Sequence, residues 1–151
     1  MKKQFYFVQL KLNTVRAAAF LAAALCAALF LSACTRGLKD GVYEGKSGVD
    51  DTGAWGEITV TVRDGKAAAC VFITRQKDGT VKDEDYGKIN GEISNQVYYD
   101  KAQLAVWAME AYAMQYAEHG DLDRVEAVSG ATIAYNQFLE AASEALEKAK
   151  K

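Results

Sequence analysis

The stretch EITVTVRDGKAAACVFITR, residues 57–75, decides the fold of this chain. Polar residues alternate in its first half with three apolar ones, Ile58, Val60 and Val62. This period of two is typical of a β-strand with one buried face. Asp64-Gly65 follows at once, and Asp-Gly between two such runs strongly favours a tight hairpin. We therefore predict antiparallel strands over residues 57–63 and 66–75.

Further elements are predicted on both sides of this hairpin. Residues 41–45 (GVYEG) favour a short strand, and the polar residues 76–95 favour a loop with room for one short strand. Asp100 and Gln103 have the spacing of a helix N-cap and its partner, and Gly120 is a stop signal after His119. The spacing predicts a helix that ends at His119.

That helix is apolar around most of its circumference. Its polar residues fall in one narrow arc, and the sheet or a partner must cover the rest, namely Leu104, Val106, Trp107, Met109, Ala113 and Met114. We expect the aromatic residues of this helix, Trp107, Tyr112 and Tyr116, to lie in the core; the alternative is that they line a ligand site. A short strand over 125–128 and an amphipathic helix after Ser129-Gly130-Ala131 complete the chain. The order strand-strand-strand-helix-strand-helix predicts an α+β fold, a small antiparallel sheet packed against two helices.

Composition narrows the range of possible functions. The chain has 151 residues and a net charge of −2, which suits one domain and excludes a nucleic-acid partner, because no basic patch exists. Cys26, Cys34 and Cys70 are the only cysteines, and we expect only Cys70 in the mature chain, as a buried thiol without chemistry. The sequence contains no Cys/His pair of the kind that would indicate a metal site or an enzyme with its own catalytic turnover.

The first residues carry a targeting signal. Four cations precede the uncharged run AAAFLAAALCAALFL at 17–31, and Leu31-Ser32-Ala33-Cys34 follows. Fifteen helical residues reach about 22 Å, short of a bilayer core of about 30 Å, so cleavage is favoured over a permanent span. We predict a lipoprotein signal peptide at 1–33, a lipidated tether at 34–40 and one domain at 41–151. As in bacterial lipoproteins, Cys34 is the expected lipid attachment site, and two or more acyl chains anchor stably.

The sequence Val128-Ser129-Gly130-Ala131-Thr132 is the candidate for chemistry. It stands where the expected strand leads into the last helix, so free N–H groups and the positive helix end suit a phosphate near Thr132. The alternative is structural: Ser129 or Thr132 caps the helix, and Gly130 permits the turn. A hydrolase built on Ser129 or Thr132 lacks a base.

These residues resemble the FMN-binding domains of sodium-translocating NADH:quinone reductases, related respiratory complexes and many bacterial surface lipoproteins. The family motif Asp-x-x-Ser/Thr-Gly-Ala-Thr corresponds to Glu126-Ala127-Val128-Ser129-Gly130-Ala131-Thr132. Glu126 stands in place of the Asp, and Ala134 where many members have Ser or Thr. DGVYEGKSG, YYDKAQLA and SGATIAYNQF make the chain most similar to small membrane-anchored, immunogen-type lipoproteins.

The resemblance implies FMN bonded covalently through its phosphate to Thr132, with Ser129, Gly130, Ala131 and Glu126 as further cofactor-binding residues. It implies an extracytoplasmic electron-transfer flavoprotein, lipid-anchored in the cell envelope. Its partners would be a flavin transferase and a membrane quinone-linked oxidoreductase or another redox partner. Trp55, between glycines, is our candidate to stack on the ring. The alternative function is a surface or antigenic lipoprotein that binds a flavin or another phosphate ligand non-covalently and has no redox role.

Overall fold

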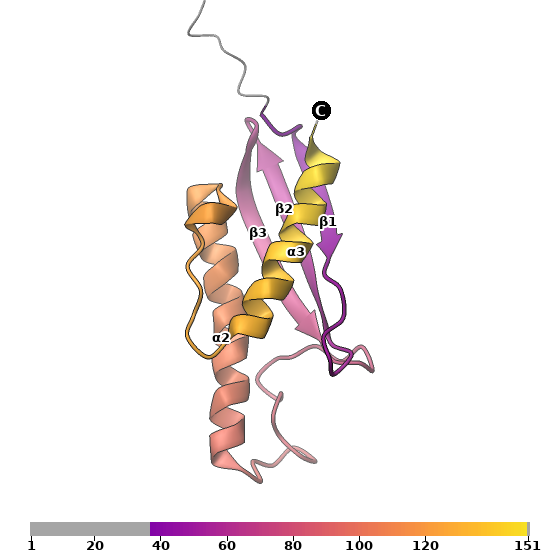
Figure 1. Ribbon diagram of the computed structural model, residues 1–151, viewed down its shortest axis with the longest axis vertical. Helices are drawn as coiled ribbons and strands as arrows, with labels where there is room; N and C mark the ends of the chain where they lie inside the picture. The colour runs from indigo at the N-terminus through magenta and orange to yellow at the C-terminus, as the bar shows by residue number, and fades with distance from the viewer. Residues whose placement is uncertain (1–36, 151) are drawn as a thin grey trace, which may run out of the picture. The chain divides into compact units, whose positions relative to one another are not determined.

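The computed structural model describes residues 37–150, which form a three-stranded antiparallel sheet with two long helices on one face (Figure 1). The strands, in the order β1-β2-β3, are Gly41–Lys46, Trp55–Arg63 and Lys66–Arg75; the helices are α2, Gln96–His119, and α3, Thr132–Ala149. The α+β prediction is confirmed. The expected signal peptide and Cys34 lie outside the described residues, and in the described part neither helix has an apolar stretch long enough to cross a bilayer.

The predicted hairpin joins β2 to β3. Asp64 and Gly65 both have positive φ, 53° and 74°, as a two-residue turn requires when it matches the twist of the strands. Arg63 pairs with Lys66 directly across it, and the register continues to Trp55 opposite Arg75, with one shift at Thr61/Val62.

The inner face of the sheet carries the core. The alternating residues of β2 and Phe72 of β3 are buried against both helices. The ring of Phe138, fully buried on α3, meets Phe72 edge-on at 5.2 Å and also lies beside Tyr112 and Tyr116 of α2. Tyr112 and Tyr116 are therefore core residues, as predicted. These aromatic contacts fix α3 against α2 and the sheet.

The helix α3 lies very close to the edge strand β1. A Cβ built on Gly45 would lie 1.9 Å from the carbonyl oxygen of Ala141, so this crossing requires glycine. Beside it, Glu144 accepts a hydrogen bond from the backbone N–H of Lys46, and Lys148 donates one to the carbonyl of Glu44. These side chains occupy the open edge of β1, which would otherwise be available to another strand.

The helix α2 begins earlier than predicted. Asn95, and not Asp100, is its N-cap, because the Asn95 side chain accepts a hydrogen bond from the N–H of Tyr98. Gly120 ends the helix in the left-handed conformation, as predicted. The sheet side covers Met109 and Ala113, but the side chains of two residues expected under cover are exposed, Trp107 by 57% and Met114 by 72%.

The strand predicted over residues 125–128 was wrong. The three-residue helix η1, Leu122–Arg124, follows α2, and the chain then runs without regular structure to α3. Its backbone bonds to side chains of α2 instead of to a strand: Gln115 accepts from the N–H of Glu126, and the Tyr112 hydroxyl accepts from the N–H of Val128. The apolar run Val125–Val128 thus packs on a helix, which a periodicity argument cannot distinguish from a strand.

Candidate functional site

The Ser129–Thr132 turn lies where the irregular segment enters α3. Gly130 has a φ of 88°, a conformation that favours glycine, and a Cβ there would lie 3.1 Å from Cδ2 of Leu104. Ala131 is buried, whereas Ser129 and Thr132 are exposed. Thr132 is the first residue of α3, so its hydroxyl lies in the first turn of the helix and is open to solvent.

No side chain caps this helix within the described residues. Ala131 occupies the N-cap position, and neither Ser129 nor Thr132 provides the capping hydrogen bond of the structural alternative. The N–H groups of the first helical turn therefore lack the side-chain acceptor that most helix starts provide. An anion at Thr132 would meet these N–H groups and the positive end of the helix dipole.

The segment before the turn is held from two sides. The Tyr112 hydroxyl accepts from Val128 at 3.1 Å and lies 3.4 Å from the carbonyl of Ala131, to which it donates. The Tyr135 hydroxyl of α3 donates to the carbonyl of Val125 at 3.0 Å. These bonds fix the backbone on which Thr132 is presented.

Glu126 is fixed through its backbone alone. Its N–H donates to Gln115 Oε1 at 2.8 Å, and its carbonyl accepts from Gln115 Nε2 at 3.5 Å. Its side chain is exposed, and no hydrogen bond joins the carboxylate to another described residue. The five predicted cofactor residues are thus on one segment, but the Glu126 carboxylate is free in solution rather than built into the turn.

A hollow of about 240 Å³ lies beside the first turns of α3. Its lining includes Asp50, Thr52, Ile133, Asn136 and Gln137. Gln137 is only 5% exposed; its Nε2 donates to the carbonyl of Ala54 at 3.1 Å, and its Oε1 is buried with no partner among the described residues. An unpaired buried acceptor is costly, and a ligand or an ordered water is the usual explanation.

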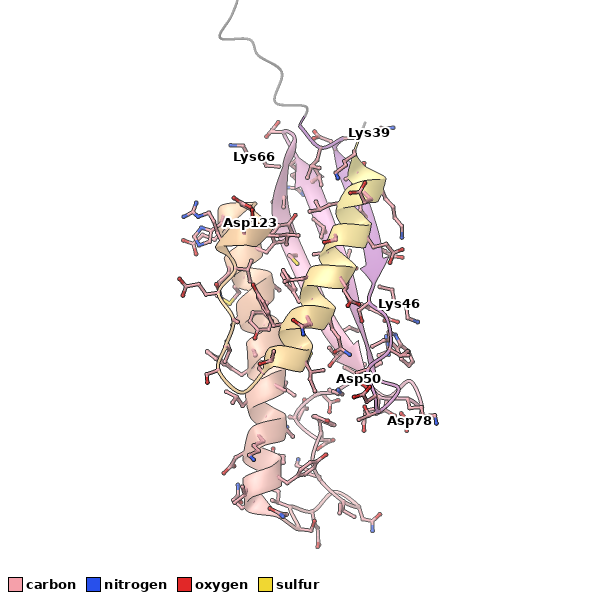
Figure 2. All side chains as sticks on the ribbon, in the orientation of Figure 1. Lys39, Lys46, Asp50, Lys66, Asp78 and Asp123 are labelled. Atoms are coloured by element: carbon pink, nitrogen blue, oxygen red, sulfur yellow. The ribbon has the colours of Figure 1, made fainter. Side chains whose placement is uncertain are left out.

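A second hollow, of about 630 Å³, shares Thr52 with the first. It lies between the β1–β2 loop and the segment after β3, and its lining includes Lys82, Tyr86 and Tyr98. Figure 2 shows the labelled Asp50 and Asp78 at the same end of the sheet as the start of α3, with Lys39 and Lys66 at the opposite end of the sheet. The two hollows therefore adjoin at Thr52, and Ile133, the residue after Thr132, lines the smaller one.

Two charged groups in this region have shifted pKa values. Burial acts to raise the pKa of Asp50, but hydrogen bonds from Thr52 and Ala54 outweigh it, so that the pKa lies below its ordinary value. Burial lowers the pKa of Lys82, while the Asp50 carboxylate acts in the opposite direction.

Other residues singled out from the sequence lie elsewhere. Trp55 points to the outer face of the sheet, where its Nε1 donates to Glu57 and Lys46 Nζ lies 4.3 Å from the ring centroid. It does not line either hollow, so the Trp55 prediction finds no support. Cys70 is a half-buried free thiol, and residues 37–150 contain no cluster of His, Cys, Asp and Glu suited to a metal ion.

Asp50, Lys82, Tyr86 and Gln137 were not recognised from the sequence. They come from a loop, from the polar segment 76–95 and from the inward face of α3, and only folding brings them together. The one local signal was Asp50 two residues before Thr52, a spacing typical of an Asx turn, which the structure forms.

The chain was compared with solved structures, curated proteins and family models. The fold resembles the crystal structure of the CPE2226 protein from Clostridium perfringens, with 22% identity, a TM-score of 0.55, and coverage of 74% of this chain and 88% of that chain. A solution NMR structure of a protein from Clostridium thermocellum is 24% identical, with a TM-score of 0.44 and coverage of 76% and 94%. No curated protein matches.

The family comparison is decisive. The model of the FMN-binding domain matches residues 53–147, which is more than half of the chain and includes the Thr132 turn. The chain therefore belongs to the family of FMN-binding domains, as its motif predicted, and is a flavoprotein that binds FMN.

Proposed function

We propose that this protein is an extracytoplasmic, membrane-anchored flavoprotein that carries FMN covalently on Thr132 and relays electrons. The observation that supports it best is the exposed Thr132 hydroxyl at an uncapped helix start, within the motif of a family that binds FMN. Covalent attachment would prevent loss of the cofactor outside the cell, where it cannot be replaced from the cytoplasmic pool.

The attachment reaction requires a separate transferase and FAD. The Thr132 oxygen forms a bond to the phosphorus that bears the riboflavin part of FAD, and the pyrophosphate bond to that phosphorus breaks. AMP leaves, and the hydroxyl proton passes to a base of the transferase. The product is a phosphodiester on Thr132, with no change in oxidation state.

The residues of this chain fit that product. A phosphodiester retains one negative charge, and the free N–H groups of the first turn of α3 would stabilise it by about 0.3–1 kcal/mol, or up to about 2 kcal/mol if partly buried. Gly130, with a φ of 88° and Leu104 close to where a Cβ would lie, gives the turn the backbone conformation that presents Thr132. Gln137 offers a buried acceptor in the adjoining hollow. FMN, once bound, supplies the capacity to accept and donate electrons.

Glu126 is proposed to act in the transfer step. Its exposed carboxylate has the same sign as the phosphodiester, so it does not favour the finished site. It can contact the transferase, for instance through a divalent ion there. Loading rates for Glu126→Asp and Glu126→Ala test this role: a slow Ala variant and a near-normal Asp variant support it, and unchanged loading in both refutes it.

The lipoprotein signal and the lipid on Cys34, both expected from the sequence of residues 1–34, support anchoring of the domain on the extracytoplasmic face of a membrane. The proposed donor is a membrane quinone-linked oxidoreductase or another redox partner. Residues 38–40, expected as part of the tether, already contact the domain: Leu38 donates to the carbonyl of Gly65 and Lys39 to that of Ala149. Globomycin-sensitive processing and [³H]palmitate labelling, both lost in Cys34→Ala, test the anchor.

A second candidate function retains FMN without the covalent bond. Glu126 and Ala134 depart from the family motif, and a surface or antigenic lipoprotein that binds FMN non-covalently accommodates both changes. Denaturation separates the two functions. After co-expression with a transferase, the covalent carrier keeps its yellow colour in the acid-precipitated protein, whereas the non-covalent form releases it to the supernatant.

A further inference from the structure

We propose that the hollow lined by Lys82, Tyr86 and Tyr98 receives the isoalloxazine ring of the flavin, and that the Lys82 ammonium stabilises the reduced ring. This inference rests on the proposed function, because it assumes that a flavin is held at Thr132. It goes beyond that function by assigning the ring to particular side chains and by identifying one residue that sets the reduction potential.

The larger hollow adjoins the smaller hollow beside the attachment point. Ile133, directly after Thr132, lines the smaller hollow together with Asp50 and Thr52. Thr52 also lines the larger hollow, in which Lys82, Tyr86 and Tyr98 lie. A ring tethered by its ribityl chain to Thr132 therefore reaches the larger hollow by passing Thr52, without crossing the core.

Lys82 is held in this hollow by its backbone. Its N–H donates to the carbonyl of Thr74 at the end of β3, 2.9 Å away, and its Nζ lies 5.1 Å from the centroid of the Tyr86 ring. The residue is half-buried, yet its ammonium forms no salt bridge with any residue from 37 to 150. Lys77, the other cation of this lining, is exposed. A desolvated cation without a close counter-ion favours an anionic or electron-rich ligand.

The aromatic part of the hollow is also held in place. Gln103 of α2 donates to the carbonyls of Asp83 and Tyr86, at 3.1 and 2.9 Å, and the N–H of Tyr86 donates to the carbonyl of Asp83. The segment that carries Lys82 and Tyr86 is thereby fixed to the helix before a ligand arrives. Such preorganisation lowers the entropic cost of binding a flat aromatic group.

Lys82 matches the chemistry of the ring. The pyrimidine side of isoalloxazine presents carbonyl oxygens in both redox states, and it gains negative charge at neutral pH when two electrons have been accepted. An ammonium nearby favours the reduced form, and charge near this part of the ring is one of the ways proteins tune a flavin. Asp50, which lines the smaller hollow, carries a charge of the opposite sign and acts against Lys82, but its carboxylate is engaged by hydrogen bonds from Thr52 and Ala54 and forms no salt bridge with Lys82.

The test measures the midpoint potential of the full-length protein, loaded with FMN by a transferase and solubilised in detergent. Lys82→Met keeps the apolar stem but removes the ammonium, so the preference of the protein for the reduced over the oxidised ring should fall at least tenfold. For a two-electron couple this lowers the midpoint potential by about 30 mV or more. Lys82→Arg is expected to stay near the wild type. Lys66→Met, which removes an exposed cation at the opposite end of the sheet, is the matched control and should not change the potential.

Three measurements keep the inference separate from the proposed function. Intact mass reports the Thr132 adduct, and circular dichroism reports folding of each variant. If every variant carries the adduct and the wild type and Lys82→Met have equal midpoint potentials, the ring assignment is wrong. The proposal of a covalently attached flavin is then unaffected.

Absence of any adduct would instead overturn the covalent carrier. In that case riboflavin, which has no phosphate, tests the hollow directly by equilibrium dialysis under anaerobic, reducing conditions. The assignment is supported if the wild type and Thr132→Ala both bind reduced riboflavin and Lys82→Met binds it with at least fivefold lower affinity. No binding, or equal binding by wild type and Lys82→Met, overturns it.

Discussion

Replacing Gly45 by alanine should separate α3 from β1. The added Cβ would lie 1.9 Å from the carbonyl oxygen of Ala141 and 2.8 Å from the backbone nitrogen of Ala145. Both obstacles are backbone atoms inside a helix, so no side chain can rotate away. The strand and the helix must move apart by about 1.5 Å to restore ordinary contact.

The magnitude follows from two opposing effects. Overpacking a well-packed contact costs typically 1–3 kcal/mol, and a clash between two backbones lies at the upper end, about 3 kcal/mol. Alanine offsets part of this, about 0.5–1 kcal/mol, by restricting the unfolded chain. The free energy of unfolding should therefore fall by about 2 kcal/mol, which lowers Tm by about 8–12 °C in a domain of this size.

Urea and thermal unfolding, followed by circular dichroism, measure this effect. Gly48→Ala is the matched control: it lies three residues on, and the nearest atom to its Cβ would be Glu140 Oε2 at 3.5 Å, an ordinary contact. The control should unfold within about 0.5 kcal/mol of the wild type. If Gly45→Ala were as stable as Gly48→Ala, the close crossing of α3 over β1 described above would be wrong.

Three further predictions concern single groups. Tyr112→Phe leaves the N–H of Val128 without its acceptor and should cost about 1–3 kcal/mol of unfolding free energy, with faster hydrogen exchange at that amide; unchanged exchange would contradict the contact. Burial raises the pKa of the Cys70 thiol to about 12. Iodoacetamide at pH 8 should therefore react about a thousandfold more slowly with the native protein than with the urea-unfolded protein, and equal rates would refute the burial of Cys70. Because the pKa of Asp50 is lowered in the folded state, its contribution to stability is present above about pH 4 and is lost as the pH falls through the pKa of the folded protein. Asp50→Asn should therefore lose less stability than the wild type between about pH 5 and about pH 3, and equal losses in the two proteins would contradict the lowered pKa.

The parts of the fold that depend on neighbouring residues could be predicted from the sequence. The hairpin over 57–75 has its own turn signal and a strict period of two, and both strands formed close to the predicted bounds. Gly120 ends α2 because glycine adopts the left-handed conformation at little cost. These features do not depend on distant contacts.

Features fixed by distant residues could not be predicted in the same way. Asp100 lost the N-cap role to Asn95, and its carboxylate instead accepts from Gln96 within the helix. The apolar run at 125–128 pairs with Gln115 and Tyr112 of α2, which are more than ten residues away. Such pairings follow from tertiary packing, not from a local pattern.

In the candidate site, too, the contiguous motif could be predicted from the sequence, whereas the residues brought together by folding could not. Thr132 was predicted because its motif is contiguous, and the structure adds that no side chain caps the helix there. The hollows beside it draw on the β1–β2 loop, the segment after β3 and two helices. Gln137 lines the hollow beside the first turns of α3, and Lys82 lines the hollow that adjoins it. Only folding brings them there, and no spacing in the sequence indicates this.

Intact mass spectrometry of the protein co-expressed with a flavin transferase tests the central claim most directly. The account predicts an increase equal to one FMN minus water, dependent on the transferase, mapped by fragmentation to Thr132, and absent from Thr132→Ala. Ser129→Ala, which changes the other exposed hydroxyl of the turn, should keep the adduct. An unmodified mass with several transferases, or an adduct that survives in Thr132→Ala, would contradict the proposal that Thr132 carries the flavin.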